Sequence, residues 1–204
     1  MSKKTRKVVV PRKTTETDIV VKLNIDGAGK SKISTGIGLL DHMLELFAFY
    51  GVFDLEIAAK GDLKVDIHHT NEDVGIVLGQ AFKKALDKKI SIGRFGFFSV
   101  PMEEVVANVV LDISGRDLFK FTILGKFGEA TQSQGGYDLN DAKHFFEAFA
   151  KHLGANLQVT LNNTDPMLHT TLEPIFKALG IALRQATQID PRRKGIPSTK
   201  GIID

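Results

Sequence analysis

The 204-residue sequence contains no cysteine and no tryptophan. Without cysteine the chain forms neither disulfides nor thiolate metal sites, so any bound metal must use histidine and carboxylate ligands. It also lacks an apolar run of membrane-spanning length. Only three valines separate the basic N-terminus from Pro11, which is too short for the core of a signal peptide. These absences predict a soluble cytoplasmic protein.

The chain also has little net charge. Its formal net charge is +3, and much of that excess lies in the two terminal segments. Nucleic-acid-binding proteins usually carry a basic stripe with interleaved aromatic residues, which this sequence lacks. A basic pocket for a phosphorylated small molecule fits the charge equally well. The hydrophobic share of 43% is enough for one large domain or for two small half-domains with a real core.

The alternation and helical spacing of apolar residues predict a mixed α and β chain. Strands are expected at 17–25, 30–33, 52–58, 102–112, 118–124 and 155–161. The first two of these are expected to form a hairpin across the turn at 26–29. Helices are expected at about 39–50, from the histidine-rich stretch to about 88, from about 142, and after the turn at 162–166. A glycine- and phenylalanine-rich connection is expected at 90–100, and an irregular tail from 190.

The most informative stretch is 66–73, which has the sequence DIHHTNED. On a helix, His68 and Glu72 lie four residues apart and share a face, so they could both bind one divalent metal. His69 is turned by about 100° from His68 and cannot easily serve the same ion. The pair therefore indicates two metals, or one metal and a substrate contact. The alternative is a polar helix start in which Asp66 or Thr70 is the cap and the other side chains are solvated.

An internal repeat favours the metal-binding interpretation. The order hairpin, short helix, strand, long helix occurs twice, and the residues of the two copies match. The matching pairs are His42 and His144, Glu45 and Glu147, Phe47 and Phe149, Leu55 and Leu157, Ile57 and Val159, His68 and His169, and Glu72 and Glu173. Histidines scattered through a core or a surface would not follow a duplication. The sequence thus predicts two fused copies of one α+β half-domain with two similar metal sites.

At this point the sequence resembles the imidazoleglycerol-phosphate dehydratase family, from about residue 12 to residue 201. The resemblance depends on specific motifs rather than on general composition. They are RxTxET at 12–17, TGIGxLDHML at 35–44, GDL at 61–63, HHTxED at 68–73, PMxE at 101–104, SGR at 114–116, FKA at 176–178 and IPSTKG at 196–201.

The resemblance implies a tandem duplication of a half-domain similar to the second domain of ribosomal protein S5. The expected organisation is a basic tail at 1–11, half-domains at 12–92 and 93–189, and a C-terminal tail at 190–204 with a phosphate-binding segment. It also implies homo-oligomers, with trimers assembling into a 24-subunit particle, and two Mn²⁺ ions in each active site where subunits meet. The implied activity is dehydration of D-erythro-imidazoleglycerol phosphate to imidazole-acetol phosphate, a hydro-lyase reaction of histidine biosynthesis.

The family pattern also assigns roles to individual residues. The implied metal ligands are His42, His68, His69, Glu72, His144, His169 and Glu173. The implied phosphate contacts are Arg94, Arg116, Lys177, Ser198 and Lys200. Glu16 would reach the glycerol part of the substrate, and Glu16 or Glu173 would transfer the proton.

Several residues depart from the family pattern. Thr170 stands where a second histidine is usual, and it predicts weaker binding of one of the two ions. Pro174 requires the last helix to start within a few residues before it. The remaining departures are Tyr50, Ile67, Gln158 and Met167.

Three other functions compete with the dehydratase. The departures permit a divergent, catalytically weak paralogue that binds a phosphorylated imidazole-like ligand or forms the same shell. A dinuclear metal hydrolase would suit paired metals, but no aspartate-rich phosphatase pattern occurs. A nucleic-acid binder has only the analogy with the ribosomal fold in its favour.

Overall fold

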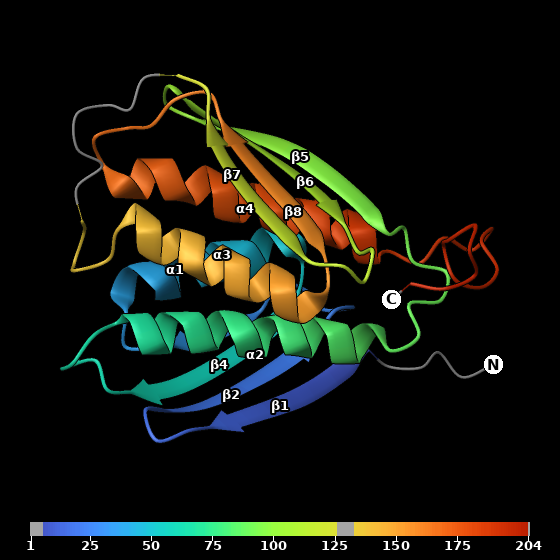
Figure 1. The fold of residues 1–204 in the computed structure, drawn as a ribbon, viewed down its shortest axis with the longest axis horizontal. Helices are drawn as coiled ribbons and strands as arrows, with labels where there is room; N and C mark the ends of the chain where they lie inside the picture. The colour runs from blue at the N-terminus through green and yellow to red at the C-terminus, as the bar shows by residue number, and fades with distance from the viewer. Residues whose placement is uncertain (1–5, 126–132, 204) are drawn as a thin grey trace.

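The computed structural model describes residues 6–125 and 133–203 and contains two similar halves (Figure 1). The first half consists of β1 (Lys7–Lys13), β2 (Thr17–Asn24), β3 (Ser31–Ser34), α1 (Gly38–Gly51), β4 (Asp54–Gly61) and α2 (His68–Leu86). The second half consists of β5 (Phe95–Met102), β6 (Val105–Asp112), β7 (Leu118–Ile123), α3 (Leu139–Leu153), β8 (Asn156–Leu161) and α4 (Leu168–Thr187). The element order repeats, so the predicted α+β duplication is confirmed.

The two sheets have the same topology. Their strand orders are β1-β2-β4-β3 and β5-β6-β8-β7. In each sheet the third strand of the half runs parallel to the fourth, and the other neighbours are antiparallel. Leu55 pairs with Leu23 and Leu157 pairs with Leu111, so the residues that match in sequence also hold the same register. The duplication therefore extends to the pairing of individual residues.

The predicted hairpin between 17–25 and 30–33 is wrong. β3 pairs with β4 in parallel, and the hairpin partner of β2 is β1. Residues 7–11, which the sequence assigned to a tail, form most of β1. Val10 is buried and Val8 packs against the core, so this segment contributes apolar surface that a tail would leave in water. Residues 1–5 and 204 of the predicted tails lie outside the described residues.

The predicted connection at 90–100 is also wrong in its second part, because β5 begins at Phe95. Gly96, which suggested a turn, marks a close approach of two backbones instead. A Cβ at this position would lie 1.8 Å from the carbonyl oxygen of Ala182 in α4. Only glycine lets this strand lie so close to the helix.

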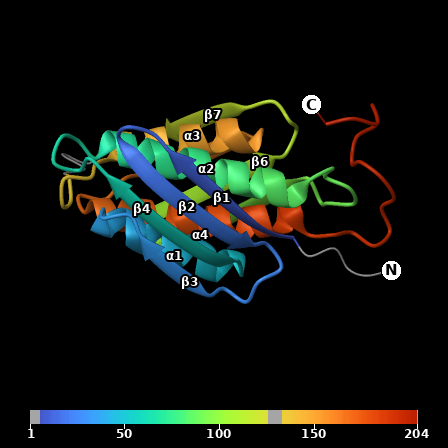
Figure 2. The same ribbon diagram turned by 90° about the horizontal axis from the view of Figure 1, so that it is seen from below.

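Each sheet is covered on one face by its own two helices, and the two helix layers pack against each other (Figures 1 and 2). The contacts between the halves join α2 to α3 and α1 to α4. Phenylalanines from both halves meet in this layer, among them Phe47, Phe82 and Phe149, and the buried core is continuous across the halves. Within the described residues, no helix is long and apolar enough to cross a membrane.

Two glycines at matching positions let the helix pairs approach closely. A Cβ at Gly79 of α2 would lie 2.6 Å from the carbonyl oxygen of Phe149 in α3. A Cβ at Gly180 of α4 would lie 2.5 Å from the carbonyl oxygen of Phe47 in α1. These contacts fix the spacing of the helices whose first two turns carry the candidate ligands.

Candidate active site

A compact group of potential metal ligands lies between α1 and α4. His42 of α1 and His169 and Glu173 of α4 present ligand atoms that all lie within 4.8 Å of one another. Glu173 Oε2 is 2.6 Å from His169 Nε2 and 3.8 Å from His42 Nε2. The two imidazole rings stack with centroids 5.1 Å apart. We call these three residues the α1–α4 cluster.

The predicted helical spacing of His169 and Glu173 is present in α4 although Pro174 follows directly. α4 begins at Leu168, a few residues before Pro174, as the sequence required. His169 and Glu173 therefore share a face of the helix despite the missing backbone donor at Pro174. Glu173 is only 12% exposed, so its carboxylate is held in a defined place.

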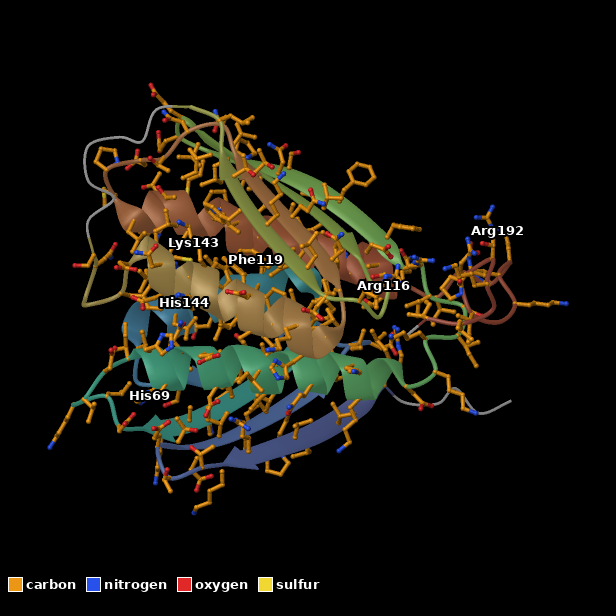
Figure 3. All side chains as sticks on the ribbon, viewed as in Figure 1. His69, Arg116, Phe119, Lys143, His144 and Arg192 are labelled. Atoms are coloured by element: carbon orange, nitrogen blue, oxygen red, sulfur yellow. The ribbon has the colours of Figure 1, made fainter. Side chains whose placement is uncertain are left out.

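The matching group lies between α2 and α3. Glu72 Oε2 is 3.5 Å from His68 Nε2, and the ring of His68 meets the ring of His144 edge-on with centroids 4.9 Å apart. Figure 3 shows His144 on the side of α3 that faces α2, at the same end of the molecule as His69. Glu72 is 49% exposed, so this α2–α3 cluster (His68, Glu72 and His144) is more open than its counterpart.

Both clusters combine the two halves of the chain. In each cluster, one histidine comes from the short helix of one half and a His/Glu pair comes from the long helix of the other half. The sequence predicted all six residues but grouped each set within one half. The pairing across the halves could not be read from the sequence, because it depends on how the two helix layers pack.

His69 belongs to neither cluster in the single chain. Its Nδ1 lies 3.1 Å from Asp62 Oδ2 and 3.9 Å from Glu16 Oε2. The hydrogen bond to Asp62 and the nearby Glu16 raise the pKa of His69. Sequence reasoning missed the role of Asp62, although this residue stands in the GDL motif. A carboxylate that orients the second ring nitrogen is a common partner of a metal-binding histidine.

Lys177, a predicted phosphate contact, lies beside the α1–α4 cluster. Its ammonium forms an ion pair with Glu173 Oε1, four residues earlier on α4, and lies 5.2 Å from the centroid of the Tyr50 ring. Burial opposes ionisation of Glu173, but the hydrogen bonds and charges of Lys177 and His169 outweigh it, so the pKa of Glu173 is lowered. A carboxylate with a lowered pKa suits metal binding better than proton abstraction.

The other predicted phosphate contacts lie apart from the clusters. The guanidinium of Arg94 forms hydrogen bonds of 2.7 and 3.1 Å to Asp112 and one of 3.0 Å to the Pro197 carbonyl. Arg116 is exposed in the turn before β7, and in Figure 3 it lies far along the molecule from His69.

The last two predicted phosphate contacts lie in the C-terminal segment. Ser198 and Lys200 form one short turn, in which the Lys200 amide donates to Ser198 Oγ at 3.2 Å. The Arg94 bond to Pro197 ties this segment to the start of β5. A single chain thus does not bring Arg94, Arg116, Ser198 and Lys200 to its metal-ligand candidates.

The donor sets of both clusters fit a divalent transition metal. Imidazole nitrogens and carboxylate oxygens are the usual ligands of Mn²⁺, Fe²⁺, Co²⁺ and Zn²⁺. Each cluster supplies three such donors, which leaves coordination positions for further ligands. The chemistry available is therefore Lewis-acid activation of a bound molecule. The exposed carboxylate of Glu16 lies 3.9 Å from His69, outside both clusters.

Comparison with known proteins identifies the family. The family model described as imidazoleglycerol-phosphate dehydratase matches residues 35–183. Curated relatives of that name include one from Caldanaerobacter subterraneus, 52% identical over 97% of this chain and 100% of its own length, and one from Pelobacter propionicus, 48% identical over 98% and 100%.

Solved structures agree as well. The enzyme of Pyrococcus furiosus aligns with a TM-score of 0.77 and 35% identity over 94% of this chain and 99% of its own. The Staphylococcus aureus enzyme aligns with a TM-score of 0.76 and 32% identity over 90% and 100%. With the duplicated fold and two His/Glu clusters in place, these full-length matches show that the chain belongs to the imidazoleglycerol-phosphate dehydratase family.

Proposed function

We propose that this chain dehydrates imidazoleglycerol phosphate with the help of two divalent cations, one for each histidine–glutamate cluster. The dehydratase activity in histidine biosynthesis follows from the family, whose curated members match over their whole length. The observation that carries the two-cation proposal is the presence of matching His/Glu groups between α1 and α4 and between α2 and α3, of which the first brings its three ligand atoms within 4.8 Å of one another. Mn²⁺ is the ion that we expect from the resemblance.

The reaction explains why such clusters are needed. The substrate carries an imidazole, two hydroxyl groups and a phosphate, and the hydrogen to be removed is not acidic, so a lone general base would fail. Bound cations supply Lewis-acid polarisation without needing a proton. His42, His169 and Glu173 would hold one ion, and His68, Glu72 and His144 would hold the other.

Glu16 is the better candidate for proton transfer. Its carboxylate is exposed in the turn between β1 and β2 and lies 3.9 Å from His69, whereas Glu173 is engaged by Lys177 and His169. After hydroxide has left the carbon next to the ring, Glu16 is therefore free to take the proton from the neighbouring carbon, which keeps its hydroxyl group and becomes an enol carbon. Glu16 then returns this proton to the ring-side carbon as the enol becomes the ketone, and the hydroxide leaves as water with the proton of the enol hydroxyl group. We assign Glu173 chiefly to metal binding.

We further propose that the complete site is shared between chains. The α1–α4 cluster offers three ligands, and His69 is directed away from His68 towards Asp62. Arg116 and the C-terminal segment that contains Ser198 and Lys200 lie at the opposite end of the molecule from the chain's own His69 and His144 (Figures 1 and 3). A homo-oligomer in which His69 and these basic residues meet the cluster of a neighbouring copy solves both problems. Trimers assembling into a 24-subunit particle are the expected form, with the cytoplasm as the expected location of a biosynthetic enzyme.

The test is turnover of imidazoleglycerol phosphate by the purified protein with added Mn²⁺, beside a Thr170→His variant. We expect the wild type to turn over the substrate and the Thr170→His variant to be only slightly more active. Metal titration should show two classes of site of unequal affinity per chain, because Thr170 supplies no imidazole, and the variant should narrow the difference. An inactive wild type that the variant restores would favour the catalytically weak paralogue, which the high identity to the curated relatives disfavours.

Mixing two inactive variants tests directly whether the site is shared between chains. Mixing Glu16→Gln chains with Glu173→Gln chains after dissociation should restore part of the lost activity, because some sites would then combine two intact contributions. No recovery in the mixed particles would argue that each chain builds its own site.

A further inference from the structure

We propose that Asp73, together with Arg12 and Thr17, is a positioning group that holds Glu16 over the His69 face of α2. This inference rests on the proposed role of Glu16. Asp73 is 7% exposed, and both of its carboxylate oxygens are engaged. Arg12 Nε donates to Oδ1 at 2.9 Å, and Thr17 Oγ1 donates to Oδ2 at 2.5 Å. We call Arg12, Thr17 and Asp73 the Asp73 triad.

The triad reaches Glu16 through one short turn. Thr14 Oγ1 accepts the amide of Glu16 at 3.1 Å and the amide of Thr17 at 2.9 Å. The same hydroxyl lies 3.2 Å from Thr17 Oγ1. Because Thr17 Oγ1 gives its proton to Asp73, the Thr14 hydroxyl is the donor in that contact. An unbroken chain of hydrogen bonds therefore joins Asp73 to the backbone of Glu16.

The position of Asp73 on α2 determines what Glu16 faces. Asp73 follows His69 by four residues, so the two side chains share a face of the helix. The triad anchors the turn 14–17 on this face, and the Glu16 carboxylate then lies 3.9 Å from His69 Nδ1. A side chain in a free turn would sample many orientations, whereas this one starts from a fixed backbone.

The second half provides an internal control. Arg12 pairs with Ile19 in the sheet as Val100 pairs with Ala107. Thr17 is the first residue of β2, and Val105 is the first residue of β6.

Asp73 completes the match. It follows the cluster glutamate of α2, and Pro174 follows that of α4. The polar triad of the first half is thus replaced by Val100, Val105 and Pro174, and Val105 is fully buried. The fold does not need polar groups at these positions.

The two halves also differ in the residue of the long helix that matches His69. Beside the apolar set, Thr170 occupies the place of His69, so no imidazole faces the turn of the second half. The polar triad occurs in the half that has both Glu16 and His69. Buried ion pairs often stabilise no better than apolar residues of similar size. The correlation therefore indicates a role in placing Glu16 rather than in holding the fold.

The experiment replaces the Asp73 triad with apolar residues. One variant carries Arg12→Val, Thr17→Val and Asp73→Leu, and a second carries the isosteric Asp73→Asn alone, so that a folding defect of the first does not end the test. Asp18→Asn is the matched control, because Asp18 follows Thr17 in β2 and its exposed carboxylate pairs with Lys13, whose Nζ lies 3.0 Å from Asp18 Oδ2. All are assayed as the assembled holoenzyme with Mn²⁺.

We expect both triad variants to lose kcat about as far as Glu16→Gln does, with metal content and KM within about twofold of wild type. Adding Glu16→Gln to either should cost less than a further twofold, because the positioning group acts through Glu16. The Asp18→Asn control should keep its kcat. An unchanged kcat, or losses that multiply independently when combined with Glu16→Gln, would overturn the proposal.

A second readout separates this inference from the proposed function. Hydrogen–deuterium exchange of the peptide containing Glu16 and Thr17 should be at least tenfold faster in both variants, while exchange at the matching turn, 103–104, stays unchanged. This holds whether or not the protein turns over the substrate. A wild type without turnover would contradict the proposed function and leave the exchange test intact, whereas unchanged exchange at 14–17 would contradict the positioning role.

Discussion

Near its first turn, α2 is attached to its surroundings by the polar side chains of Asn71 and Asp73, whereas the matching positions of α4 carry the apolar residues Leu172 and Pro174. Asn71 donates to the Asp141 carbonyl at 2.7 Å and accepts from the buried Tyr137 hydroxyl at 2.9 Å. The matching residue of α4 is Leu172, which is fully buried. The same backbone fold accepts polar or apolar side chains at these matching positions. The directional hydrogen bonds occur in the half that contains His69 and Glu16, whose side chains need a defined orientation.

The outer faces of the two sheets differ in the same way. One row of the first sheet carries Val9, Lys22, Glu56 and Lys32, with an ion pair of 3.0 Å between Lys22 and Glu56. The matching row of the second sheet carries Phe97, Val110, Gln158 and Lys120. The duplicated strands thus keep their register while their exposed residues change freely. Matching positions therefore provide natural pairs for mutagenesis.

The largest expected effect comes from the cluster glutamates. Glu173→Gln should remove the metal of the α1–α4 cluster and lower kcat/KM by at least about 100-fold, or about 2.7 kcal/mol. The reason is that Glu173 is nearly buried and bonded to His169, so a neutral amide cannot replace its charge there. Metal analysis of the purified protein and steady-state kinetics measure both effects.

The matched variant Glu72→Gln tests whether the two clusters are equivalent. Glu72 is half exposed and 3.5 Å from His68, so we expect its loss to weaken metal binding in the α2–α3 cluster with less effect on the structure around it. The two variants should each lose about one ion per chain. Full metal content in both would remove the basis for two separate cation sites.

A smaller effect is expected from the two arginines at matching positions. Arg6 pairs with Asp26 and the Thr187 carbonyl, and Arg94 pairs with Asp112 and the Pro197 carbonyl. Lysine cannot reproduce either fork. Arg94→Lys should therefore loosen the segment that holds Ser198 and Lys200.

The expected result is a rise of about tenfold in KM for the phosphorylated substrate, or about 1.4 kcal/mol, with little change in kcat. Arg6→Lys should change thermal stability but leave KM within about twofold. Equal effects of the two variants on KM would show that Arg94 does not act through the C-terminal segment or the phosphate.

The smallest expected effect is on the free energy of unfolding and comes from Asp54, whose matching residue in the second half is the amide Asn156. Asp54 accepts from the Ala28 amide at 2.8 Å and from Asn24 at 3.1 Å, and these bonds lower the pKa of Asp54. The matching residue in β8 is Asn156. Because the folded-state pKa lies below the unfolded value, the carboxylate stabilises the fold above the unfolded pKa, and that contribution is lost as the pH falls through the folded one.

Asp54→Asn should therefore unfold more easily than wild type at neutral pH, by less than about 1 kcal/mol because water screens the carboxylate. The difference should close below about pH 4. Urea denaturation at several pH values measures it. A difference that stays constant down to pH 3 would mean that the shifted ionisation is not its source.

Much of the fold could be predicted from the sequence, because the duplication repeats the same motifs and the same order of elements in both halves. The spacing of His68 and Glu72 and of His169 and Glu173 predicted helices with shared faces, and both pairs lie on such faces. β1 was missed because its basic residues resemble a tail and its few apolar ones are visible as a strand only once β2 is beside them.

Other features could not be predicted for physical reasons. The partner of each His/Glu pair depends on which helices pack, and that is determined by close approaches at Gly79 and Gly180 rather than by local pattern. The engagement of Arg94 by Asp112 depends on register between strands. Asp73 looked like one more acidic residue of the motif until its two oxygens were found on Arg12 and Thr17.

The pairing of α1 with α4 and of α2 with α3 has a consequence for the origin of the chain. A half-length ancestor with one short helix and one long helix would have possessed no complete cluster of its own. Two copies would have had to dimerise, each lending its short-helix histidine to the long helix of the other. Fusion of the two genes then turned an association between molecules into one within a molecule. Thereafter each copy could change separately, which is how one half came to keep His69 while the other has Thr170.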